Sequence, residues 1–93
     1  MADTLGLLAE ARQLATDLGY RIREEPLGEL PGGRCSIGGV DHILLNLEHS
    51  VAEQLDRLLS AIAADPRLAG EPKSRLLDMR LRSLSGGAGQ ANR

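Results

Sequence analysis

The segment spanning residues 33–64 constrains the fold of this chain more than any other. It contains two adjacent glycines, Gly38 and Gly39, an apolar run over 43–47 and a helix-start pattern at 50–53. Adjacent glycines reach the positive φ angles that tight hairpin turns require. The sequence therefore predicts a β-hairpin that is followed directly by a helix.

The length of the hairpin loop decides which side chains share a face of the sheet. A loop of three or five residues would place Cys35 and Ile37 on the apolar face with Ile43 and Leu45, and a loop of two residues would place Cys35 opposite His42. We expect the odd-numbered loop, because it buries more apolar area and leaves no polar side chain facing the core.

Three segments show the spacing of amphipathic helices. Asp3 can cap the first helix and Gly19 should end it. Ser50 and Glu53 match the capping box at the start of the second helix, and Pro72 suits the first turn of the third. The expected buried positions are Leu7, Leu8, Ala11, Leu14, Ala15 and Leu18 in the first helix, Val51, Leu55, Leu58, Leu59 and Ile62 in the second, and Leu76, Leu77, Leu81 and Leu84 in the third.

The remaining segments complete an α-β-β-β-α-α order of elements. Residues 20–25 alternate in polarity and should form the first strand, with Tyr20 toward the core, and residues 26–33 form a loop rich in proline and glycine. We expect an α+β fold in which helices cover one face of a three-stranded, mainly antiparallel sheet. Residues 1–85 should form a single domain, with Ile43, Leu45 and Leu47 beneath the second helix, and residues 86–93 a disordered tail.

Composition limits the size of the core and the cellular setting. Tyr20 is the only aromatic residue among 93, so the core must be built from smaller aliphatic side chains, and a domain this small gains from pairing with a second copy. The single cysteine cannot form an internal disulfide, and no apolar run approaches the roughly 20 residues that span a bilayer. Residues 1–4 lack the basic start of a signal peptide. We expect a cytoplasmic protein without membrane contact.

Residues of the types that bind metals are few and widely spaced. His42 and His49 stand at opposite ends of the predicted strand, about 20 Å apart at about 3.3 Å per residue, so they should not share an ion. Cys35 would be a nucleophile only if the two-residue loop supplied His42 as its base. The glycines lack the Lys-Ser or Lys-Thr of a phosphate loop. We therefore expect no catalytic residue, no metal and no cofactor.

Recognition of another molecule is the function that this composition leaves open. We expect a non-catalytic protein–protein interaction module that forms a homodimer or binds an unidentified protein partner. Its contacts would come from Asn46 on the open face of the sheet or from Arg75, Arg80 and Arg82 on the third helix. The alternative is that these arginines bind nucleic acid or another anionic partner. Nucleic acid is the less favoured partner, because the net charge is −2 and stacking aromatic residues are nearly absent.

One short pattern resembles a known family. The sequences Leu18-Gly19-Tyr20, Ile43-Leu44-Leu45-Asn46 and Ser50-Val51-Ala52-Glu53-Gln54-Leu55 are similar to the N-terminal half of the ImmA/IrrE-like zinc peptidase domains, over about residues 8–64. Where that family has its HExxH helix, this chain has Leu55-Asp56-Arg57-Leu58-Leu59-Ser60-Ala61-Ile62. The resemblance implies a degenerate scaffold without zinc or protease activity. The chain also resembles small bacterial proteins to which no activity is assigned.

Overall fold

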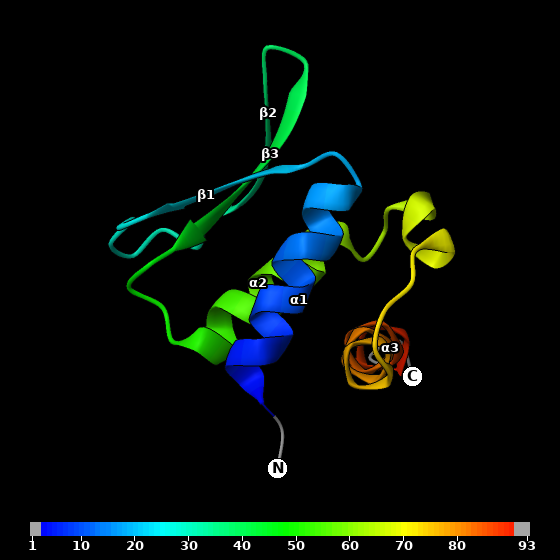
Figure 1. The fold of residues 1–93 in the computed structure, drawn as a ribbon. Helices are drawn as coiled ribbons and strands as arrows, with labels where there is room; N and C mark the ends of the chain where they lie inside the picture. Colours follow the sequence, from blue (N-terminus) through cyan, green and yellow to red (C-terminus); the bar gives the residue numbers. More distant parts are fainter. Residues whose placement is uncertain (1–2, 91–93) are drawn as a thin grey trace.

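The structure is a computed structural model that describes the backbone of residues 3–90 and the side chains of residues 3–84. The expected α+β fold and the order α-β-β-β-α-α are confirmed. The elements are α1 (Thr4–Asp17), β1 (Arg21–Glu25), β2 (Gly33–Ile37), β3 (Val40–Asn46), α2 (Val51–Ile62), a short 3-10 helix η1 (Pro66–Gly70) and α3 (Arg75–Gln90). Figure 1 shows α1 and α2 together on one side of the sheet, with α3 beyond α1. No helix within residues 3–90 is both long and apolar enough to cross a membrane.

Local sequence signals set the ends of the first two helices as expected. The Asp3 carboxylate accepts a hydrogen bond from the Gly6 N–H at 2.9 Å. Gly19 has a φ of 101°, and the amides of Gly19 and Tyr20 close the helix end by donating to carbonyls of the last turn of α1. The predicted capping box of Ser50 and Glu53 is present at the start of α2. Each helix therefore begins or ends where its cap residue satisfies a free backbone group.

The sheet is mixed, with strand order β1-β3-β2. The hairpin strands β2 and β3 are antiparallel, and β1 runs parallel to β3. Because β3 occupies the centre, the chain leaves β1 and crosses the end of β3 before it enters β2 (Figure 1). Two strand edges are consequently free, those of β1 and β2.

The hairpin register differs from the expected one. Ile37 pairs with Val40 and Cys35 pairs with His42, so the loop has two residues rather than three or five. Gly38 and Gly39 have φ angles of 58° and 82°, the two positive values of the turn that matches the natural twist of a hairpin. Turn geometry therefore outweighed apolar burial, and the side chain of Ile37 is left 50% exposed.

The predicted core is correct except at four positions, of which Leu84 is partly buried. The buried residues include Leu7, Leu8, Ala11, Leu14, Ala15 and Leu18 of α1 and its end, Tyr20, Ile43 and Leu45 of the sheet, Leu55, Leu58, Leu59 and Ile62 of α2, and Leu77 and Leu81 of α3. The placement of Leu47 beneath α2 was wrong, because β3 ends at Asn46 and Leu47 lies 51% exposed beyond it. Val51 and Leu76 are also exposed, each at or near the first turn of its helix.

Helix α3 begins later and extends further than the sequence suggested. The Ser74 hydroxyl accepts a hydrogen bond from the Leu77 N–H, which sets the helix start at Arg75 rather than near Pro72. The expected tail starts at Gly86, whereas α3 continues to Gln90. Residues 91–93 of that tail lie outside the described residues.

Candidate functional site: a basic groove beside a free strand edge

The arginines proposed from the sequence do not form one open cationic patch. The Arg80 guanidinium donates to the Asp56 carboxylate of α2 at 3.0 Å, and Arg82 donates to Asp78 of its own helix at 2.9 Å. Arg75 is exposed at the first turn of α3. Two of the three charges are thus balanced by adjacent carboxylates, and Arg80 joins α3 to α2.

Asn46 is not on an exposed face of the sheet, so its expected role as a surface contact was wrong. Its side chain is 1% exposed. The amide oxygen accepts from the N–H groups of Leu27 and Glu48, and the amide nitrogen donates to the carbonyls of Gly28 and Leu30. Asn46 therefore holds the β1–β2 connection against the end of β3, a structural role.

The connection passes close to the backbone of β3. A Cβ atom on Gly32 would lie 2.4 Å from the Leu44 carbonyl oxygen, and Gly32 has a φ of 78°. Only glycine fits this approach without a shift of the backbone. Leu27 is half-buried under the same loop, whereas Leu30 is exposed.

A buried polar cluster joins β1 to the segment after α2. The Tyr20 hydroxyl donates to the Asp65 carboxylate at 2.8 Å, and Arg67 donates to the same carboxylate through its side chain and its backbone N–H. The guanidinium groups of Arg34 and Arg67 lie 5.3 and 5.9 Å from the centre of the Tyr20 ring. These contacts place cations against the only aromatic ring of the chain.

The pKa shifts in this cluster favour the ion pair between Asp65 and Arg67. Hydrogen bonds from the Arg67 side chain and backbone, and then from the Tyr20 hydroxyl, hold the pKa of Asp65 well below its usual range. Burial and then the hydrogen bond to Asp65 raise the pKa of Tyr20. Asp65 is therefore ionised and Tyr20 protonated at neutral pH, and each is fully engaged with its partner.

The thiol and imidazole considered for catalysis are cross-strand neighbours. Cys35 lies opposite His42, as the two-residue loop requires, and its thiol is free and half-buried. The His42 Nδ1 lies 3.0 Å from the Val40 carbonyl oxygen. No hydrogen bond joins the thiol to the imidazole among the described side chains. In the same part of the chain, no three histidine, cysteine or acidic side chains converge as metal ligands would.

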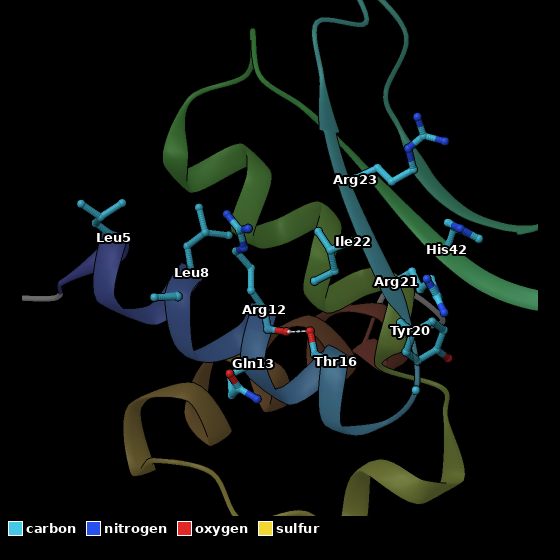
Figure 2. Close-up of a pocket in the computed structure, with 12 residues that line it drawn as sticks. Leu5, Leu8, Arg12, Gln13, Thr16, Tyr20, Arg21, Ile22, Arg23 and His42 are labelled. Carbon is cyan, nitrogen blue, oxygen red and sulfur yellow. Dashed lines mark hydrogen bonds between the residues drawn. The ribbon is translucent and has the colours of Figure 1, made fainter.

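A large concave surface lies between α1 and the free edge of β1. This groove, called the β1 groove below, has a volume of about 970 Å³. Figure 2 shows α1 running across the direction of β1, with Leu5 and Leu8 on one side of Arg12 and Ile22 on the other. It is lined by Leu5, Leu8, Ala9, Arg12, Gln13, Thr16, Gly19, Tyr20, Arg21, Ile22, Arg23 and His42.

The residues that line the β1 groove carry positive charge. Its lining contains three arginines and no aspartate or glutamate, although the whole chain has a net charge of −2. Arg12 forms an ion pair with Glu24, and Arg23 pairs with Glu25 at 2.7 Å. The side chain of Arg21 has no ion-pair partner among residues 3–84. The groove surface itself is consequently basic, with its acidic counterions at the rim.

The backbone of β1 offers unpaired hydrogen-bonding groups to this groove. The Glu25 carbonyl accepts from the Leu47 N–H at 3.0 Å and so faces β3. Backbone groups of successive strand residues alternate in direction, so those of Ile22 and Glu24 point to the free edge. No hydrogen bond of the described residues engages these groups. A strand edge of this kind is a template for another extended chain.

The sequence predicted the strand but not the groove. The alternation of Arg21, Ile22 and Arg23 indicated one solvated face, and the groove forms where residues of α1 lie beside Ile22. The signal that could have indicated the groove is Leu5, an apolar residue on the polar side of the first helix, which is 66% exposed.

Comparisons with known proteins add no relative. Neither a scan against protein-family models nor searches of curated proteins and of solved structures find a match to this chain. The resemblance to ImmA/IrrE-like domains stays a prediction.

Proposed function

We propose that this chain is a non-catalytic protein-interaction module that binds an extended polypeptide segment in the β1 groove. The observation that carries the proposal is the free edge of β1 beside a groove of about 970 Å³. An extended segment that joins the edge would complete the backbone hydrogen bonds that Ile22 and Glu24 leave open.

Apolar surface in the groove supports the same reading. Leu5 is two-thirds exposed, and Ile22 is only half-buried at the edge of the core. A strand lying next to β1 would cover Ile22, and burial of apolar area stabilises association. Backbone pairing and apolar burial would therefore act together at this one surface.

The polar side chains elsewhere have structural partners. Asn46 holds a loop, Asp65 is bonded to Tyr20 and Arg67, and Arg80 joins two helices. A basic α3 surface is therefore a weaker basis for binding an anionic partner than the β1 groove. A second copy of the chain is the alternative occupant of the same edge, because it could supply the added strand.

Blocking the edge tests the proposal. We expect Glu24→Pro to abolish binding of extended peptides, because proline removes the N–H that Glu24 turns to the free edge while the hydrogen bonds to β3 remain. Glu24→Ala is the matched control, since it loses the same carboxylate but keeps the N–H.

The measurement is a screen of an array of random eight-residue peptides against the wild type and both variants. Hydrogen exchange of the Ile22 and Glu24 amides is then followed with the peptides that bind. The proposal predicts that these two amides become protected and that only Glu24→Pro loses binding. Binding that survives Glu24→Pro, or protection located outside β1, would refute it.

A further inference from the structure

We infer that the partner segment is acidic, with apolar residues at alternate positions. This inference rests on the proposed function, since it assigns the chemistry of the chain that joins β1. It goes beyond that proposal because a free strand edge by itself pairs with any extended backbone.

The charge of the groove favours an acidic partner. Arg12, Arg21 and Arg23 line it, and no carboxylate does. Arg21 carries its charge without an ion-pair partner in the described part of the chain. The pairs that Arg12 and Arg23 make with neighbouring glutamates involve side chains that are each about a third or more exposed, and such pairs are worth little. Incoming carboxylates can therefore replace or join these glutamates at low cost.

The two faces of β1 differ in chemistry. Side chains of an added strand alternate between the two sides of the sheet. On the helix side they would meet Ile22 and the Arg12–Glu24 ion pair, with Leu5 further along α1. On the open side they would meet Arg21 and Arg23, which pair in register with His42 and Leu44 of β3. One set of positions therefore favours apolar residues and the other favours acidic ones.

The length of β1 limits the length of the segment. The strand has five residues, and Ile22 and Glu24 each offer one N–H and one C=O. An added strand of five or six residues would satisfy all four groups over about 17 to 20 Å. The inferred partner is thus a short linear segment in which glutamate or aspartate alternates with leucine, isoleucine or valine.

The test compares three labelled eight-residue peptides by fluorescence anisotropy. Leucine alternates with glutamate in the first, with glutamine in the second and with lysine in the third. We expect the glutamate peptide to bind at least tenfold more tightly than the other two, and its affinity to fall as salt screens the arginines.

Two double variants connect this preference to the groove. Arg21→Glu/Arg23→Glu should weaken binding of the glutamate peptide at least tenfold and leave the glutamine peptide almost unchanged. Arg57→Glu/Arg75→Glu is the matched control, because it makes the same change in net charge with exposed residues outside the β1 groove. Thermal unfolding of each variant shows whether it is folded.

Each outcome separates the inference from the proposed function. Equal binding of the three peptides, lost in Glu24→Pro, would overturn the acidic partner and leave the interaction module standing. Binding of none of them, while peptides from the random array do bind, would also overturn the acidic partner alone. A concentration-dependent dimer in which the Glu24 amide is protected would assign the edge to a second copy and overturn this inference. Failure of every extended peptide would overturn both.

Discussion

Replacing Asn46 with alanine removes four hydrogen bonds, three of which hold the β1–β2 connection. The side chain accepts from the amides of Leu27 and Glu48 at 3.0 and 2.9 Å and donates to the carbonyls of Gly28 and Leu30, both at 2.9 Å. Asn46 is 1% exposed, so water does not compete for these bonds in the folded state. The variant leaves four backbone groups without their partner.

The expected loss of stability follows from these bonds. A protein hydrogen bond contributes about 1 kcal/mol net, and a buried group left without a partner costs more. Three of the four partner residues, Gly28, Leu30 and Glu48, are exposed, so water can reach them after the change, which limits the penalty. We expect Asn46→Ala to lower the free energy of unfolding by about 3 to 4 kcal/mol. Since domains of this size are stable by about 5 to 15 kcal/mol, the variant should fold with a much lower unfolding midpoint.

Urea unfolding followed by far-ultraviolet circular dichroism measures this loss, with hydrogen exchange reporting the Leu27 and Glu48 amides. Gln13→Ala is the matched control, because Gln13 is an exposed amide with one side-chain bond, to Asp17. Its effect should be below about 0.5 kcal/mol. A loss below about 1 kcal/mol in Asn46→Ala, with unchanged amide protection, would show that the loop is held by other contacts.

Three further changes test the cluster, the hairpin and the docking of α3. The pKa of Asp65 is depressed in the folded state, so its ion pair stabilises the fold above the ordinary pKa of 3.8, and this stability is lost as the pH falls below that value. Asp65→Asn should therefore flatten the decline of the urea midpoint between pH 6 and pH 2.5. An unchanged slope would contradict this. Gly38→Ala should cost about 1 to 2 kcal/mol in the same unfolding assay, because φ is 58° there; no loss would argue against this turn. Glu10→Ala removes two bonds to Ser74, each 2.6 Å long, and should speed amide exchange in the first turn of α3 without affecting β1; equal exchange would show that α3 is docked by its apolar contacts alone.

The parts of the fold that depend on neighbouring residues were predictable. Helix stripes repeat every three or four positions, and caps depend on residues three apart, so the starts of α1 and α2 and nearly all their buried residues followed from the sequence. Gly19 ended α1 for the same reason. The fold class followed because three apolar stripes and three strands have few ways to pack.

The errors arose where two local rules disagreed or where distant residues meet. At Gly38 and Gly39 the sequence supported both a two-residue turn and a longer loop, and the estimate of buried area favoured the wrong one. Asn46 looked like a solvated strand residue because the residues it bonds lie 16 to 19 positions earlier in the loop. Residue spacing in the sequence gives no sign of such a contact.

The site escaped prediction because strand order is not a local property. The strand order β1-β3-β2, which leaves β1 at an edge, depends on the β1–β2 connection crossing the end of β3. The groove then forms because α1 passes beside that edge. Leu5 could indicate a contact surface on α1, but an exposed leucine on a helix does not show which strand passes beside it.

The charges on β1 account for two properties of its edge at once. Four of the five residues of the strand are charged, and charged side chains on a short edge strand oppose pairing with apolar strands. The same arginines favour an added strand that brings carboxylates, because like charges opposite each other destabilise a strand pair and opposite charges stabilise it. If the charges on β1 only prevented strand pairing, their sign would not matter, and neither the lysine peptide nor the glutamate peptide would bind. If the edge is selective, as we infer, only the acidic peptide binds beside Arg21 and Arg23. Reversing these two charges then makes the β1 groove prefer basic peptides over acidic ones.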